Sequence, residues 1–197
     1  MTNRILRVLG PLLFVVAVAA MFGLLYASRS ISAQTPAVKD NEELSRLCVE
    51  DQADRTLDPR QIDWTVVSTR DRARRARAKE LYNQNRLQTG TDFFNAALIL
   101  QHGDLPEDFL LAHELCVVAI IKGKSQAKSL AAATEDRFLM NIGRPQRFGT
   151  QYRSDPANAP MKLYPVDPNV TDALRRALNV PTLAEAKALE AELNKKQ

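Results

Sequence analysis

Two strongly apolar stretches, separated by a few turn-forming residues, constrain the fold of this chain more than any other feature. They read "TDFFNAALILQH" and "PEDFLLAHELCVVAIIKG", and only "GDL" lies between them. The second stretch is apolar nearly all round at the helical spacing, which is the pattern of a helix in the centre of a domain. A connection this short makes the two helices antiparallel neighbours. The sequence therefore predicts a helical hairpin at the centre of the domain.

More polar helical patterns flank this hairpin on both sides. "NEELSRLCVEDQADR" and "STRDRARRARAKELYNQ" precede it, and "SQAKSLAAATEDRFLMNIG" follows it. Apolar residues recur at spacings of three and four in the first, and the second is rich in alanine and arginine, which favour helices. The three stretches predict three further helices.

The chain changes character after Gly143. "GRPQRFGTQYR" and "MKLYPV" are short alternating runs on either side of the turn-rich "SDPANAP", a pattern typical of a β-hairpin. Two closing helices are expected in "VTDALRRALNV" and "PTLAEAKALEAELNKK". Thr182 and Glu185 have the spacing of a capping box at the start of the second.

The first 27 residues have the composition of a membrane-directed leader. After the basic "MTNRILR", residues 8–27 form an uncharged run of 20 residues, about the length that crosses a bilayer as a helix. Residues 28–40 read as a linker, and residues 41–197 as a single domain. The expected fold class is mainly α: a helical bundle built on αα-hairpins with a small two-stranded β-hairpin, preceded by an N-terminal membrane helix.

Two interpretations of the leader stay open. A cleaved secretory signal has an apolar core of about 7 to 15 residues and small residues before the cut. Ser30 and Ala33 are small, but a cut after Ala33 would place Ile31 at the third position before it. The pattern favours a signal anchor over a signal peptide, and the basic flank favours a domain outside the membrane.

The net charge of +4 comes mostly from the leader. Arg4, Arg7 and Arg29 lie in the first 33 residues, which contain no acid, and the remaining chain has 24 basic and 23 acidic residues. A domain this close to neutrality gives no reason to expect a nucleic-acid partner.

The arginine-rich helix agrees with this conclusion. Arg70 and Arg74 project on one side of it, whereas Arg72 and Arg75 project on the other, so no single basic face forms. Arginines paired with acids, or in contact with water, are favoured over a nucleic-acid or lipid surface.

The acids between the two apolar stretches are predicted to be structural. Asp104 can accept hydrogen bonds from the free amides of the following helix, and Pro106 suits the first turn. Glu107 and Asp108 complement the positive end of the helix dipole.

The only two histidines, His102 and His113, lie in the same hairpin. An antiparallel hairpin that turns at Gly103 brings Asn95 level with His113. Asn95 and His102 share one side of their helix, so the three residues are expected to line a polar slot. The neighbouring acids point away from His113, and neither a metal nor a cofactor is expected. Histidines that are simply hydrogen-bonded in the core are the alternative.

Arg137 and Asn141 fall in the middle of the inward apolar stripe of the helix after the hairpin. A buried guanidinium needs a carboxylate or several carbonyl groups, because an unpaired buried charge is very costly. Arg137 is therefore either a helix-anchoring ion pair or a clamp for an anionic ligand.

Cys48 and Cys116 could form a disulfide if the domain lies outside the cytoplasm. Cys116 belongs to the most apolar helix, where a cysteine behaves as a small core residue. The free, buried form is favoured.

An ordered set of blocks between about Asp51 and Ala186 resembles a bacterial family known only as a domain of unknown function. Its hallmark is a G-x-P-Q-x-aromatic-G-T-Q segment after a D-R-aromatic-L helix. Those positions are held here by Asp136, Arg137, Phe138, Leu139, Gly143, Pro145, Gln146, Phe148, Gly149, Thr150 and Gln151. The resemblance implies a mainly helical fold with a small hairpin and no particular reaction. Phe93 and Phe94 depart from it, since tyrosine and histidine often stand there.

Two functions remain possible on these grounds. The first is a binding module for a polar or acidic ligand or peptide, anchored in a bacterial inner membrane with its domain on the extracytoplasmic side, or periplasmic after cleavage. Its candidate ligand-binding residues are Asn95, His102, His113, Arg137, Asn141, Gln146 and Gln151. The second is a hydrolase-like enzyme with His102 or His113 as general base and Arg137 or Gln151 stabilising negative charge. Binding is favoured, because the sequence contains no recognisable nucleophile motif.

Overall fold

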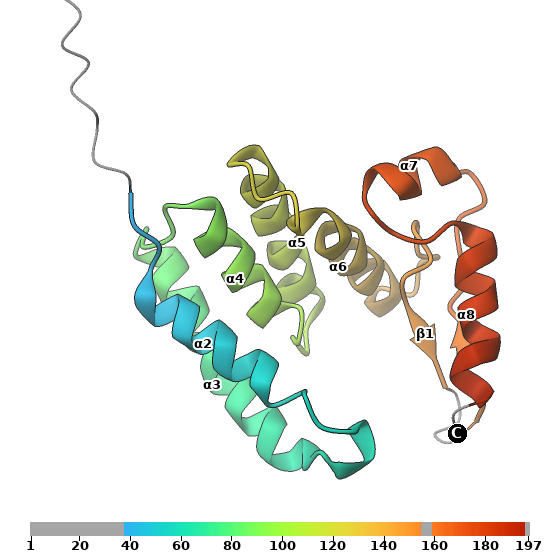
Figure 1. The fold of residues 1–197 in the computed structure, drawn as a ribbon, viewed down its shortest axis with the longest axis horizontal. Coiled ribbons are helices and arrows are strands. Elements are labelled where there is room, and N and C mark those ends of the chain that lie inside the picture. The colour runs from blue at the N-terminus through green and yellow to red at the C-terminus, as the bar shows by residue number, and fades with distance from the viewer. Residues whose placement is uncertain (1–37, 155–158, 196–197) are drawn as a thin grey trace, which may run out of the picture. The chain divides into compact units, whose positions relative to one another are not determined.

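The computed structural model describes residues 38–154 and 159–195, and α-helices dominate them (Figure 1). In chain order the elements are α2 (Glu42–Ala53), the 3₁₀ turn η1 (Pro59–Gln61), α3 (Trp64–Asn83), α4 (Gly90–Leu100), α5 (Pro106–Ile121), α6 (Ala127–Asn141), β1 (Tyr152–Arg153), β2 (Lys162–Leu163), α7 (Asp172–Ala177) and α8 (Leu183–Lys195). The predicted mainly helical fold with a small β-hairpin is confirmed.

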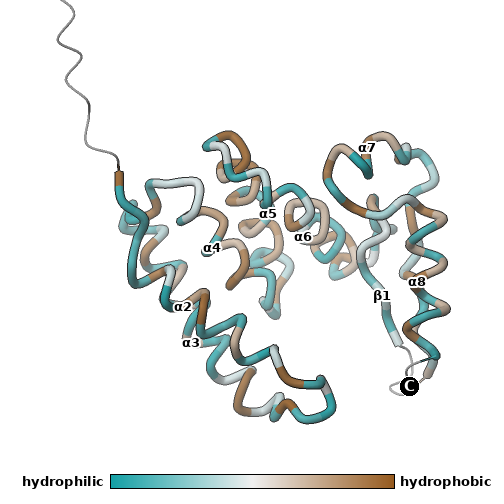
Figure 2. The backbone as a smooth tube through the Cα atoms, in the orientation of Figure 1, coloured by the Kyte–Doolittle hydropathy of each residue, from teal (hydrophilic) through white to brown (hydrophobic). Residues whose placement is uncertain are grey.

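Helices α4 and α5 form the predicted central hairpin. α4 contacts α2 and α3 as well as α5, and α5 packs between α4 and α6. Small and apolar side chains that are fully buried fill the hairpin: Ala96, Ala97, Ile99, Leu100, Ala112, Cys116 and Ala119. Figure 2 shows the same contrast along the chain, since brown tones are more frequent in α4 and α5 than in α3. The main core therefore lies along this hairpin.

The turn between α4 and α5 depends on a glycine and on Asp108. A Cβ atom added at Gly103 would lie 2.2 Å from the Cβ of Asp108, so a larger residue does not fit without a shift. The carboxylate of Asp108 accepts a hydrogen bond from the backbone N–H of Asp104 at 3.2 Å. The predicted cap by the side chain of Asp104 is therefore wrong, because that carboxylate pairs with Arg75 of α3 instead. Pro106 occupies the first turn of α5, as predicted.

The chain after α6 forms the hairpin and the two short closing helices. β1 and β2 pair antiparallel, with Tyr152 opposite Leu163 and Arg153 opposite Lys162. α8 packs on β2. A second apolar cluster joins this part to α6 and consists of Ala132, Phe148, Val170 and Val180. The predicted β-hairpin and both closing helices are confirmed.

The predicted start of α8 is confirmed, and a side chain also caps α2. The N–H of Glu185 donates to Oγ1 of Thr182 at 3.3 Å, and the N–H of Thr182 donates to Oε2 of Glu185 at 2.7 Å, which completes the capping box of α8. The side chain of Asn41 accepts a hydrogen bond from the N–H of Leu44 at 3.0 Å and caps α2. α2 thus begins directly after Asn41.

The leader and most of the linker, residues 1–37, lie outside the described residues. Across residues 38–154 and 159–195, no helix combines the length and the apolar character that a membrane span needs.

Candidate functional site

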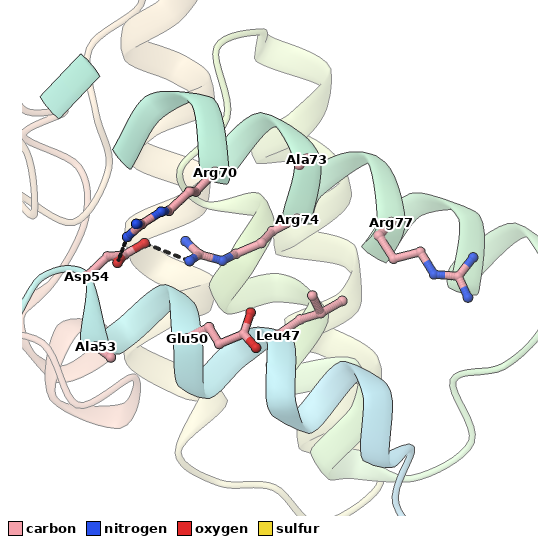
Figure 3. A pocket seen from close by; sticks show the side chains of 8 residues that line it. All are labelled: Leu47, Glu50, Ala53, Asp54, Arg70, Ala73, Arg74 and Arg77. Carbon is pink, nitrogen blue, oxygen red and sulfur yellow. Dashed lines mark hydrogen bonds and ion pairs between the residues drawn. The ribbon is translucent and has the colours of Figure 1, made fainter. Parts of the chain in front are cut away.

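Four arginines of α3, Arg70, Arg74, Arg75 and Arg77, make ion pairs with acids, as the sequence predicted. Arg70 and Arg74 share the carboxylate of Asp54 at the end of α2, at 2.7 and 2.6 Å, and the dashed lines in Figure 3 mark both contacts. Arg77 binds the carboxylate of Glu43 at 2.6 Å. These contacts hold α3 against α2 and leave no unpaired basic stripe on this side of α3.

A buried charge cluster, made of Asp51, Arg55, Asp71 and His102, lies where α2, α3 and the end of α4 meet. Asp51 is fully buried, and its carboxylate accepts a hydrogen bond from Nη1 of Arg55 at 3.3 Å. Nη2 of the same guanidinium lies 2.5 Å from the carboxylate of Asp71. Nε2 of His102 lies 3.5 Å from Asp51. The cluster therefore contains an imidazole and a carboxylate in close approach.

Burial shifts the pKa values of this pair in opposite directions. Burial raises the pKa of Asp51 from 3.8 to about 6, and the charge of Arg55 opposes part of this rise. Burial lowers the pKa of His102 from 6.5 to about 3, and the nearby guanidinium groups, Arg55 first, lower it further. At neutral pH the carboxylate is therefore ionised and the imidazole is neutral.

Arg137 of α6 lies beside this cluster. Its side chain is half-buried, and its Nη1 donates to the carbonyl of Gln101, next to His102, at 3.0 Å. Its Nε is buried and has no hydrogen-bond partner within residues 38–154 and 159–195. Burial lowers the pKa of Arg137, and the charge of Arg55 lowers it further. The predicted bond to a backbone carbonyl is confirmed, and the described residues supply this guanidinium with no carboxylate.

The polar slot expected between α4 and α5 does not form. Nδ2 of Asn95 donates to Oγ of Ser45 on α2 at 3.4 Å, and His102 faces the buried charge cluster. Nδ1 of His113 lies 3.0 Å from the carbonyl of Ala131 on α6. Asn95 and His102 do share one side of α4, but that side faces α2.

Two of the candidate ligand-binding residues, His113 and Asn141, do not join Arg137 in one site. His113 contacts α6 at Ala131, which points about 120° away from Arg137 on the helix. The imidazole and the guanidinium are thus on different sides of α6. Asn141 is exposed, and its amide donates to the carbonyl of Arg137 at 2.9 Å. It therefore bonds to its own helix and does not face inward.

Gln146 and Gln151 organise the loop that precedes β1. Gln146 is fully buried, and its amide nitrogen donates to the carbonyls of Gln151 and Tyr164 at 3.0 and 2.8 Å. Its Oε1 accepts from the N–H of Gln151 at 2.9 Å. The amide of Gln151 donates to Oγ1 of Thr150 at 2.9 Å. Both side chains are engaged in holding the loop.

Two fully buried charges support the same loop, and neither was predicted. Asp136 accepts hydrogen bonds from the N–H groups of Arg147, Phe148 and Thr150 at 2.7, 2.9 and 3.0 Å. Arg175 donates to the carbonyls of Phe148 and Arg147, each at 3.1 Å. Asp136 lies on the side of α6 opposite the apolar stripe, so helical periodicity predicts an exposed carboxylate there. Only a prediction of the loop position would have shown that Asp136 is buried.

No group of three or more histidine, cysteine or acidic side chains in the part of the chain that the structure describes is arranged to hold a metal ion. Cys48 and Cys116 are free and buried. Burial raises the pKa of the Cys48 thiol to about 11 and that of Cys116 to about 12. Both behave as core residues.

Comparisons of the chain with protein-family models, with curated proteins and with solved structures found no match. The resemblance carried by Asp136, Arg137 and the loop from Gly143 to Gln151 stays a prediction, and the function has to be argued from the geometry alone.

Proposed function

We propose that this chain is an anion-binding module, held at the extracytoplasmic face of a membrane by its N-terminal apolar run, and that it binds carboxylate or phosphate groups at Arg137. The observation that carries this proposal is the half-buried guanidinium with a buried Nε–H that has no partner in residues 38–154 and 159–195. An anion bound at the exposed part of the guanidinium would neutralise its charge.

The surrounding charges support the same conclusion. Arg55, whose charge acts unfavourably on Arg137, has its own acids and pairs with Asp51 and Asp71. Arg137 has no such acid among the described residues. An anion bound at Arg137 would therefore supply the counter-charge that Arg55 already has.

Thermal stability provides the test. The full chain in neutral detergent micelles is melted with sodium phosphate or sodium succinate, against sodium chloride at equal ionic strength. A ligand at 100 times its dissociation constant stabilises the fold by about 2.7 kcal/mol, which raises the melting temperature by several degrees.

Arg137→Gln should abolish this rise, and the matched control Arg72→Gln, on the exposed side of α3, should keep it. An equal response of the native chain and both variants would show that the anions act on the protein surface in general, and the proposal would be wrong.

The hydrolase-like alternative has one observation in its favour, the approach of His102 to Asp51 at 3.5 Å. A pKa of about 3 makes His102 a weak base at neutral pH, and Asp51 is fully buried. Gln151 is engaged with the loop around Thr150. Turnover of generic ester, peptide or phosphate substrates that His102→Gln abolishes would favour the enzyme over the binding module.

A further inference from the structure

We propose that anion binding at Arg137 is coupled to a proton, which the buried pair of Asp51 and His102 takes up, so that the chain binds an anion more tightly at mildly acidic pH than at neutral pH. This inference rests on the proposed function and adds the regulation of the same site.

Arg137 and the buried pair meet at the end of α4. Nη1 of Arg137 donates to the carbonyl of Gln101 at 3.0 Å. His102 follows Gln101 directly, and its Nε2 lies 3.5 Å from Oδ2 of Asp51. The side chain of Arg55 contacts Asp51, and its charge acts on both His102 and Arg137. The pair and the anion site therefore share one backbone segment and one neighbouring guanidinium.

The geometry of the pair provides a place for a proton. Asp51 is fully buried, and Nε2 of His102 is buried without a hydrogen-bond partner in residues 38–154 and 159–195. A proton held by one of these two residues has the other nearby as an acceptor. Whichever residue holds it, the proton removes the one negative charge of the pair.

The other charged groups around the pair come from the chain after α2, from α3 and from α6. They are Arg55, Asp71, Arg74, Arg75 and Arg137. Arginines keep their charge at every pH considered. Carboxylates usually titrate near about pH 4, whereas burial raises the pKa of Asp51 to about 6. The charge of the pair therefore changes between neutral and mildly acidic pH.

The direction of the coupling follows from these charges. At neutral pH, an anion at the exposed part of Arg137 is repelled by the negative charge of the pair, and a proton on the pair removes this repulsion. The affinity for an anion should therefore rise as the pH falls through about 6. By reciprocity, a bound anion should raise the affinity of the pair for its proton by the same factor. For two partly buried charges that do not touch, we expect a factor of about 3 to 10.

Calorimetric titration of the full chain with sodium sulfate, in neutral detergent micelles at constant ionic strength, tests the coupling. Sulfate stays doubly charged across this pH range, whereas phosphate and succinate titrate within it. The dissociation constant of the native chain should fall about 3-fold to 10-fold between about pH 7.5 and about pH 5. Near pH 6, the pKa of Asp51, sulfate binding should take up protons, which a comparison of two buffers with different ionisation enthalpies measures.

Two variants identify the group that takes up the proton. Asp51→Asn should bind sulfate at about pH 7.5 as tightly as the native chain does at about pH 5, and its affinity should no longer depend on pH. The matched control is Glu135→Gln, which removes another acid whose pKa is raised by burial. Glu135 points about 160° away from Arg137 on α6 and approaches Arg147 at 3.4 Å, so this variant should keep the pH dependence.

The outcomes separate the coupling from the anion site itself. Sulfate binding that Arg137→Gln abolishes, but that takes up no proton and does not change with pH, would refute the coupling and leave the anion site in place. No sulfate binding, or binding that Arg137→Gln does not weaken, would refute both. A pH dependence that Asp51→Asn keeps and Glu135→Gln removes would assign the proton to Glu135 and overturn the proposal. Melting temperatures verify that each variant is folded, and the proton uptake of the native chain decides the outcome if Asp51→Asn is unstable.

Discussion

At the scale of single residues, buried charges of the described residues differ in how completely they are hydrogen-bonded. Asp136 and Arg175 are both fully buried, and each is surrounded by backbone partners. Arg137 immediately follows Asp136 in the sequence, yet it makes one bond to a carbonyl. A charge with complete bonds stabilises the fold, whereas an incomplete one leaves hydrogen-bonding capacity for a ligand.

The pKa shifts of Asp51 and His102 predict that a change of pH alters the stability of two variants in opposite directions. The folded pKa of Asp51, about 6, lies above its usual 3.8, so its protonation stabilises the fold as the pH falls through 6. The folded pKa of His102, about 3, lies below its usual 6.5, so its contribution is present above pH 6.5 and is lost as the pH falls toward 3. In the native chain the stabilising effect of Asp51 and the destabilising effect of His102 offset each other as the pH falls below about 6.

Melting temperatures measured between about pH 7.5 and about pH 4.5 check this prediction. Relative to the native chain, His102→Gln should gain stability as the pH falls, because only the Asp51 effect remains. Asp51→Asn should lose stability over the same range. Each difference is limited to about 1.4 kcal/mol per pH unit. Two variants whose stability changes in the same direction would contradict the pKa values of the pair.

At the scale of secondary-structure elements, the sequence predicted which helices form better than which faces meet. The apolar pattern correctly predicted the α4–α5 hairpin, and the spacing of Thr182 and Glu185 correctly predicted the start of α8. A helical wheel gives the angle of a side chain but not the neighbour on that side. Asn95 was therefore expected to face α5, although it faces α2. The roles of Gln146 and Asp136 depend on a loop path that no periodicity describes.

The α4–α5 turn provides a prediction at this scale. Gly103→Ala should destabilise the fold by about 1 to 3 kcal/mol, because the new methyl group would overlap Asp108 at the start of α5. Gly123→Ala, at the other end of α5, is the comparison: its Cβ would meet no atom within 4 Å, and only its φ of +89° disfavours alanine, by about 1 kcal/mol. Urea unfolding of both variants measures the difference. A loss at Gly103 no greater than that at Gly123 would mean that the turn accommodates a side chain.

At the scale of the whole molecule, the proposed anion site joins two helices that are separated in the sequence. Arg137 belongs to α6, and its Nη1 donates to the carbonyl of Gln101 at the end of α4, at 3.0 Å. The site lies in residues 41–197, and the proposed location of those residues depends on the leader.

The topology of the chain is the prediction on which the proposed location depends. The arginines at positions 4 and 7 precede the 20-residue apolar run, and such charges favour an N-terminus inside and a domain outside. Alkaline phosphatase fused after Gln197 should therefore be active in bacterial cells, and deletion of residues 8–27 should abolish that activity. A cytoplasmic C-terminus would refute both the anchored and the secreted form. The mature N-terminus separates these two forms: a chain that keeps its first residues is anchored, whereas one that begins between Ser28 and Thr35 has lost a signal peptide.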